Sequence, residues 1–364
     1  KVRITAQLIR SKDDAHLWSQ TYDRSLDDIF QVQTEISEAI AQQMKIELIG
    51  ENLNVRRGIT HKPEALELYM QASFFMNKMT DKSIKEAITL YKDAITIDPQ
   101  YALAYAGIAN CYIALDGVNY YKYFKSDDIK NYTNAKTYSQ KALDIEPKLG
   151  EALTVVARMK ESLDKDYDEA DRLYNKAIEY SPDYAMAYHS YGRFLNWRYK
   201  DFLKSRAMYK RALSLDPLSP NINASAGEVY LAAQGRLYSR EVENDTAYYY
   251  LNKAFQLDPN YVNGNHLYLF TELLENRHEM DRAETLRNKA FELDPNNFTI
   301  LFGMTYHYIM RWDLEKAKFY LEKLIELGFS WPSAYAIEGW FHFFGENNID
   351  DAIPYLKKAI YKND

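Results

Sequence analysis

The stretch that decides the fold is ITIDPQYALAYAGIANCYIAL, residues 95–115, because the motif around its proline recurs along the chain. Hexamers that begin with alanine and end with proline close at six positions: Pro99, Pro147, Pro182, Pro217, Pro259 and Pro295. They read AITIDP, ALDIEP, AIEYSP, ALSLDP, AFQLDP and AFELDP, at intervals of 48, 35, 35, 42 and 36 residues. A base period of about 35 residues with two insertions explains these intervals, and such a period predicts a repeat architecture.

Each proline is preceded by small residues at fixed distances. Alanine stands five residues before every proline, and a small residue stands twelve before it: Ala87, Ala135, Ala170, Ser205, Ala247 and Ala283. Eight or nine residues before the prolines stand larger side chains: Tyr91, Tyr138, Tyr174, Tyr209, Tyr250 and Leu286. These spacings are multiples of a helical turn, so they predict one packed helix face. Proline then ends the helix, because it lacks an amide hydrogen and disfavours α geometry in the residue before it.

The repeat resembles the tetratricopeptide repeat, a pair of antiparallel helices of about 34 residues with small residues at set positions. Tyr105, Ile108, Ala109 and Tyr112 match first-helix positions of that consensus. The last two units keep the small residues but lose the closing proline. We count eight repeats over residues 63–364, so the resemblance implies an all-α chain built as an α-α superhelix.

Residues 1–48 follow another pattern. VRITAQLI and HLWSQTYD alternate apolar and polar residues as strands do, and an apolar stripe after Ser25 predicts a helix, so this part is a small α+β fragment. The segment resembles the end of the TolB-like domain that precedes tetratricopeptide repeats in large bacterial signalling proteins. The resemblance implies a partial TolB-like domain over 1–48, a linker over 49–62 and repeats over 63–364.

Polypeptides of this kind carry an adenylate or guanylate cyclase domain, or a winged-helix DNA-binding domain, at their other end, often with a membrane helix between. The resemblance therefore implies a scaffold or regulatory module of a bacterial signalling protein, related to adenylate cyclases, with the cyclase chemistry outside this chain. It implies a cytoplasmic location, or a periplasmic one if the parent protein is membrane-anchored.

Composition and motifs exclude several other classes of function. The net charge of −7 argues against nucleic acid as a partner, because phosphate groups are neutralised by basic surfaces. No apolar run approaches the roughly 20 residues of a membrane span. The single cysteine, Cys111, excludes an internal disulfide. Neither phosphate-binding glycine loops nor catalytic motifs occur, so we expect no catalytic residue, no cofactor and no metal.

The concave side of the superhelix is where we expect a partner to bind. By the geometry of the repeat, this side is lined by the residues seven and eleven after each proline. The resulting candidates grade from polar and basic to aromatic: Asn110, Arg158, His189, Arg193, Asn196, Trp197, His266, Phe270, Phe302, Tyr306 and Trp340. That gradient predicts an extended peptide with an acidic group near the arginines and apolar side chains near the rings.

Alternatives to this interpretation remain open at the level of the sequence. The rings could pack against one another instead of a ligand. A metal or acid–base role for His189 and His266 would need partner ligands, and none is evident nearby in the sequence. The Lys and Asn pattern with which some members of the fold clamp the C-terminal carboxylate of a chaperone is absent. We therefore weigh three functions: a peptide-binding module, a small-molecule or sugar sensor that uses the aromatic part, and an enzyme.

Two further features lead to expectations about contacts. The insertions DGVNYYKYFKSDDIK and QGRLYSREVENDT either contact a ligand or lengthen helices. The two N-terminal strands lack the rest of their sheet, and unpaired strand edges seek partners. We expect them to pair with a second molecule, to pack on the first repeats or to be poorly ordered.

Overall fold

The computed structural model divides the chain into two compact units, Lys1–Ile59 and Thr60–Asp364. The structure describes residues 2–10, 15–24, 58–78, 80–118, 126–232, 240–261, 263–328 and 332–361. The helix expected after Ser25 and most of the linker expected over 49–62 lie outside the described residues.

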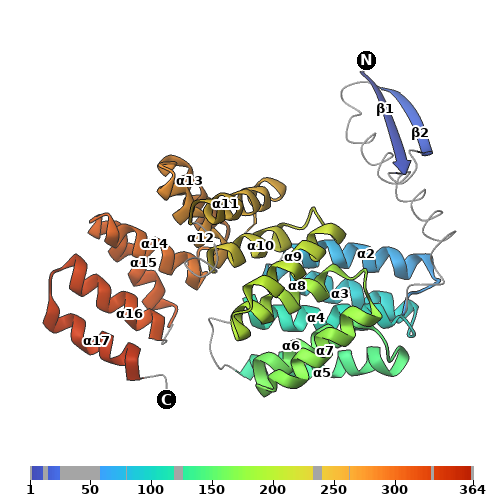
Figure 1. Ribbon diagram of the computed structural model, residues 1–364, viewed down its shortest axis with the longest axis horizontal. Coiled ribbons are helices and arrows are strands. Elements are labelled where there is room, and N and C mark those ends of the chain that lie inside the picture. Colours follow the sequence, from blue (N-terminus) through green and yellow to red (C-terminus); the bar gives the residue numbers. More distant parts are fainter. Residues whose placement is uncertain are drawn as a thin grey trace. The chain divides into compact units, whose positions relative to one another are not determined.

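The described part of the second unit consists of sixteen α-helices in eight hairpins, which Figure 1 shows as successive pairs from α2–α3 to α16–α17. The pairs are α2 (Pro63–Asn77) with α3 (Asp81–Ile97), α4 (Ala102–Val118) with α5 (Ser126–Ile145), α6 (Gly150–Met159) with α7 (Tyr167–Tyr180), α8 (Ala185–Phe194) with α9 (Phe202–Leu215), α10 (Pro220–Ala232) with α11 (Arg240–Leu257), α12 (Gly264–Asn276) with α13 (Met280–Leu293), α14 (Phe298–Met310) with α15 (Leu314–Glu326), and α16 (Pro332–Trp340) with α17 (Ile349–Tyr361). Three first helices continue into a π-helical turn: η2 (Lys160–Asp164), η3 (Leu195–Tyr199) and η4 (Phe341–Gly345).

The corner at each repeat proline has the same hydrogen bond. In all six repeats the residue just before the proline donates its amide to the carbonyl oxygen of the alanine five residues before the proline, at 2.9–3.1 Å. Asp98, for example, donates to Ala94 at 2.9 Å and its backbone is already extended, with φ −129° and ψ 93°. The proline itself offers no amide to continue the helix, so the chain turns into the next first helix.

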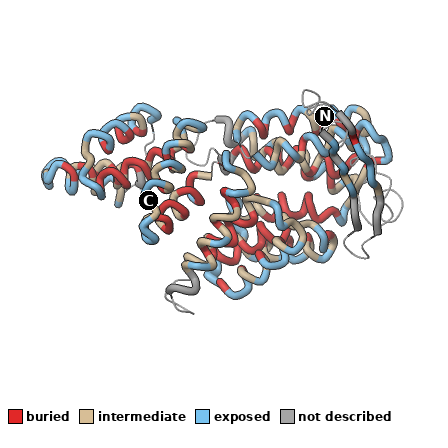
Figure 2. The backbone as a smooth tube through the Cα atoms, turned by 90° about the horizontal axis from the view of Figure 1, so that it is seen from above, coloured by how far each residue is buried: buried red, intermediate tan, exposed pale blue. Residues whose placement is uncertain are grey.

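The small residues lie where the helices approach most closely. Each alanine five residues before a proline is at most 4% exposed, and each small residue twelve before it is fully buried. Figure 2 shows the same pattern along the helices, with buried stretches on the faces that meet neighbouring helices and exposed stretches on the outer faces. Small side chains allow this approach, which is the structural reason for the recurring hexamers.

The larger residue of the pattern is placed at one of the two expected positions. The residue eight before the proline is buried in all six repeats: Tyr91, Ser139, Tyr174, Tyr209, Leu251 and Arg287. Positions twelve, eight and five before the proline are four and three residues apart, so they form one stripe, whereas position nine is rotated by about 100°. Tyr138, Tyr250 and Leu286, at position nine, are half-buried, and they pack against the core clusters from the side.

The two insertions lengthen helices in the part of them that is described. In the second repeat α4 has 17 residues and α5 has 20, and in the fifth repeat α11 has 18, against 14 for α7 and α9. Residues 119–125 and 233–239 lie outside the described part of the chain, so contacts of the insertions with a ligand remain a prediction.

The first unit contains an antiparallel hairpin of β1 (Val2–Arg10) and β2 (Ala15–Arg24) in its described residues. In the backbone register Ile4 pairs with Tyr22 and Leu8 with Trp18, and Tyr22 is 5% exposed. The hydroxyl groups of Thr5 and Thr21 lie 3.0 Å apart.

Candidate functional site

The first helices of successive hairpins contact one another and carry all the candidate residues. We call the surface formed by positions seven and eleven after each proline, together with the π-helical turns η2 and η3, the first-helix face. Position seven is buried from the second to the sixth repeat: Ala106, Thr154, His189, Ala224 and His266. Position eleven is half-buried in these repeats except at Phe270. The two positions thus differ, because position seven lies in the seam between adjacent helices.

The polar part of the first-helix face joins α4, α6 and α8. Arg158 Nη1 donates to Asn110 Oδ1 at 2.9 Å, which links the second repeat to the third. Arg193 Nη2 donates to Glu161 Oε2 at 2.8 Å, and the Tyr174 hydroxyl donates to the same oxygen at 2.8 Å. Glu161 comes from η2, which turns its carboxylate from the third repeat toward the arginine of the fourth. The structure therefore pairs Asn110 with Arg158 and Arg193 with Glu161, two contacts that each link neighbouring repeats.

The two histidines of the site are held by hydrogen bonds inside the seam. His189 Nε2 lies 3.0 Å from Ser225 Oγ. His266 lies with Nδ1 2.8 Å from the Tyr261 hydroxyl and Nε2 3.2 Å from Glu228 Oε2. Both imidazoles are less than 8% exposed, so they connect neighbouring repeats.

The pair of His189 and Ser225 does not amount to a catalytic dyad. Burial and the nearby Arg193 and Arg158 lower the pKa of His189 to about 3. A base with so low a pKa is a poor proton acceptor near neutral pH, and His189 Nδ1 has no orienting partner. The geometry favours a structural role for this pair.

Asn196 and Trp197 follow in η3 and have contrasting environments. Asn196 is 4% exposed, and its Oδ1 has no hydrogen-bond partner among the described residues. Trp197 is 54% exposed and has the Lys200 ammonium 5.4 Å from its ring centre. Trp197 thus offers an accessible ring on the turn that follows Arg193, in the part of the face that the sequence analysis described as polar and basic.

The aromatic part of the first-helix face lies on α14 and α16. Tyr306 and Trp340 have ring centres 5.8 Å apart, and Phe302 and Trp340 6.4 Å apart. These three rings contact one another, as the alternative interpretation predicted, but each remains only half-buried. Phe270 is different: it is fully buried and stacks on Phe255 at 5.1 Å. Phe270 therefore belongs to the core and is not available to a ligand.

The sequence analysis missed a second charged cluster, between α12, α13 and α14. Glu275 Oε1 accepts from Arg287 Nη1 at 2.6 Å and lies 3.0 Å from His307 Nδ1 and 3.6 Å from Arg311 Nη2. Arg287 occupies the core position eight residues before Pro295, where most repeats have an apolar or aromatic residue. That departure from the repeat pattern is the signal that could have revealed it.

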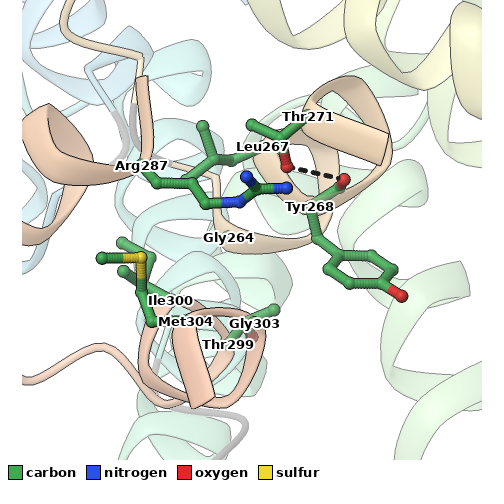
Figure 3. Close-up of a pocket in the computed structure, with 9 residues that line it drawn as sticks. All are labelled: Gly264, Leu267, Tyr268, Thr271, Arg287, Thr299, Ile300, Gly303 and Met304. Atoms are coloured by element: carbon green, nitrogen blue, oxygen red, sulfur yellow. Dashed lines mark hydrogen bonds between the residues drawn. The ribbon is translucent and has the colours of Figure 1, made fainter. Parts of the chain in front are cut away.

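A crevice beside this cluster is too small for a small-molecule ligand. Figure 3 shows it between residues of α12, Arg287 of α13 and residues of α14, with the hydrogen bond from Thr271 Oγ1 to the Tyr268 carbonyl at 3.0 Å. Its cavity volume is about 10 Å³, room for roughly one water molecule. Within the described residues no group of His, Cys, Asp and Glu side chains is arranged to hold a metal ion. None of the described helices combines the length and apolar character of a membrane span.

The comparisons with known proteins agree on the fold. No protein-family model matches the chain. Putative adenylate cyclase 3 of Rhizobium meliloti (strain 1021) is 33% identical over 147 residues, which are 40% of this chain and 24% of that protein. The chain thus spans about a quarter of the length of this relative.

Two solved structures are similar over most of the chain. The human IFIT1 dimer with PPP-AAAA has a TM-score of 0.55 at 15% identity, covering 92% of this chain and 81% of that chain. The APC/C hetero-tetramer Cut9-Hcn1 has a TM-score of 0.52 at 15% identity, covering 88% and 52%. At such identities the likeness shows the fold alone. The expected all-α fold, an α-α superhelix of tetratricopeptide type, is confirmed.

Proposed function

We propose that this chain is a non-catalytic protein-binding scaffold within a multidomain signalling polypeptide related to adenylate cyclases. The observation that supports the proposal is the first-helix face, whose half-buried residues include Arg158 of α6, Arg193 of α8 and aromatic rings on α14 and α16. An extended peptide can use both, with carboxylates at the guanidinium groups and apolar side chains at the rings.

The link to adenylate cyclases comes from sequence similarity. The relative from Rhizobium meliloti bears that name, and this chain covers only a quarter of it. We propose that the cyclase chemistry resides elsewhere in the polypeptide, and that residues 1–48 are the end of a TolB-like domain, 49–62 a linker and 63–364 the repeats. A pure preparation of this chain that turned over a nucleoside triphosphate would contradict the non-catalytic part of the proposal.

Among possible ligands, a peptide is favoured over nucleic acid and over small molecules. The fold itself does not choose, since the IFIT1 structure contains PPP-AAAA and the Cut9 structure contains Hcn1. The net charge of −7 disfavours a polyanion. The crevice at α12–α14 has room for only about one water molecule, so it does not support the small-molecule alternative.

The test is a peptide-binding experiment with matched variants. An array of ten-residue peptides, acidic at one end and aromatic or aliphatic at the other, is probed with the wild-type chain and compared with peptides in which lysine replaces each acid. We expect acidic peptides to bind, and binding to fall about tenfold or more in the double variant R158Q/R193Q and in W340A. The control is R172Q, which changes an exposed arginine of the second helix α7, away from the first-helix face. Equal binding by all variants would refute the assignment of the face.

The hairpin of the first unit is a second candidate contact. Each of its described strands pairs on one side only, with the other. We propose that its edges join those of a second copy, because unpaired edges are templates for strand addition. A proline at an amide of β1 that points away from β2 would remove one edge donor, and light scattering would then report a monomer where the wild type forms a dimer.

A further inference from the structure

The seam between α6 and α8 has an unbalanced set of charges. Two guanidinium groups, those of Arg158 and Arg193, face one carboxylate, that of Glu161. Glu161 is bound to Arg193 at 2.8 Å and accepts from the Tyr174 hydroxyl as well, so its Oε2 is already shared by two donors. The next carboxylate along the face, Glu228, is turned to His266 at 3.2 Å.

Arg158 forms no direct ion pair with a described residue, although the charge of Glu161 acts on it from a longer distance. Its hydrogen-bond partner is the neutral amide of Asn110, and the described residues place no carboxylate within ion-pair distance of it. Burial, and then repulsion from Arg193, lower the pKa of Arg158, which shows that its surroundings disfavour the positive charge. A partly buried cation without an anion is costly, and an incoming anion would relieve that cost.

Two buried polar atoms nearby also lack partners. His189, on the same helix as Arg193, is 7% exposed and its Nδ1 has no hydrogen bond, and Asn196 is 4% exposed with Oδ1 unpaired. Native proteins leave few buried polar atoms unsatisfied, and those that occur call for an explanation such as a bound ion or water. The Arg193 side chain is 38% exposed, so its guanidinium group can be reached from solvent.

We propose that Arg158 and Arg193 together bind one oxyanion, a carboxylate or phosphate of the partner, and that Glu161 is an internal competitor that partly occupies this site in the free protein. The proposal rests on the proposed function for its biological ligand, but the site can be tested without one. Guanidinium groups suit this role because their planar fork matches the two oxygens of a carboxylate or phosphate. A fixed internal carboxylate would also set a threshold, so that only a doubly charged or bidentate group displaces it.

The experiment measures binding of inorganic phosphate and of acetate to the intact chain. Calorimetric titration and thermal unfolding are carried out in sodium phosphate and in sodium acetate, each against sodium chloride at equal ionic strength. We expect saturable stabilisation of the wild type by phosphate, because a ligand that binds only the folded state raises its stability. Affinity should fall about tenfold to a hundredfold in R158Q, as for loss of a hydrogen bond to a charged group.

The variant E161Q separates the internal competitor from a merely structural carboxylate. Removing the negative charge while keeping the shape should raise the affinity for phosphate about tenfold or more. Tighter binding of phosphate than of acetate would assign the site to phosphorylated partners, and similar binding of both would assign it to carboxylates. R172Q, with its exposed pair to Glu169, is the control.

The outcomes distinguish the two proposals. Phosphate or acetate binding that R158Q abolishes, with no peptide bound, would support the site and reject the scaffold as proposed. Peptide binding without any response to either anion in the wild type or in E161Q would reject the oxyanion site and leave the scaffold. If E161Q does not fold, as judged by circular dichroism, the affinities of R158Q and the wild type for phosphate still test the oxyanion site.

Discussion

Two charged clusters of this molecule have similar side chains but different states of balance. At α6–α8, Glu161 pairs with Arg193, while Arg158 has only an amide partner. At α12–α14, Glu275 contacts Arg287, His307 and Arg311, and a second carboxylate, Glu272, lies close enough to affect and be affected by them. The second cluster therefore has two carboxylates for its two arginines, whereas the first has one carboxylate, Glu161, for Arg158 and Arg193.

Exposure separates the clusters as well. The Arg287 side chain is 6% exposed and occupies a core position, whereas the Arg193 side chain is 38% exposed on the first-helix face. The same residue types thus serve as an internal connection in one place and as a candidate ligand site in the other. The two clusters differ in charge balance and in access to solvent. Each cluster can therefore be tested by the change in stability when one of its charges is removed.

The largest effect is expected from Glu275→Gln. This change leaves the buried Arg287 without its carboxylate, and breaking a buried pair by removing one partner costs about 3–5 kcal/mol. Urea unfolding followed by circular dichroism measures it. Glu322→Gln, whose pair with Lys318 is exposed, should change the stability by less than about 0.5 kcal/mol. Similar losses in both variants would show that the Glu275 cluster is not a closed internal connection.

Lowering the pH should weaken the same cluster. Burial, and then the charge of Arg287, lower the pKa of His307 to about 4. Glu275 raises this pKa, whereas the charges of Arg311 and Lys316 lower it further. Between that value and the ordinary pKa of about 6.5, the unfolded chain binds more protons than the folded one. Stability is therefore fully present above pH of about 6.5 and is lost as the pH falls through about 4.

The contribution of His307 to this loss is at most about 3 kcal/mol. His307→Gln should flatten the dependence of the unfolding free energy on pH in that window. A parallel course for wild type and His307→Gln would contradict the assignment.

Two glycines, one in each region, sharpen the comparison at the level of packing. A Cβ at Gly150 of α6 would lie 2.5 Å from the carbonyl oxygen of Ala177, so Gly150→Ala should cost about 1–3 kcal/mol through overpacking. A Cβ at Gly303 of α14 would meet Tyr268 Cδ2 at an ordinary 3.5 Å. Gly303→Ala should leave the protein as stable or about 0.5–1 kcal/mol more stable, because alanine favours the helix. Thermal unfolding of both variants shows whether each substitution raises or lowers the stability.

The smallest effect is expected from Arg158→Gln in the free protein. Its charge has no counter-ion to lose, so the substitution should change the unfolding free energy by less than about 1 kcal/mol. Arg287→Gln, which strands Glu275, should cost several times more. Chemical denaturation of the pair in the same buffer makes the comparison, and a larger loss for Arg158→Gln would mean that the charge is balanced in the native state.

Much of the fold was predictable because each repeat is defined by residues that lie at fixed, short distances along the sequence. The six small residues twelve before the prolines and the six alanines five before them are all buried, and the eight hairpins lie where the period placed them. The candidate site was predictable only in part. Phe270 was assigned to the face by register but belongs to the core, because the fifth and sixth repeats pack Phe255 against it.

The sequence by itself determined the hairpins, their corners and the buried stripe, since these depend on helical periodicity and on the missing amide of proline. Only the tertiary structure decided which charges meet. Arg158 finds Asn110 across 48 residues and Arg193 finds Glu161 across 32, so these contacts depend on how successive first helices pack and on where a π-helical turn places a carboxylate. Packing between repeats is set by surfaces far apart in the chain, and no local spacing encodes it.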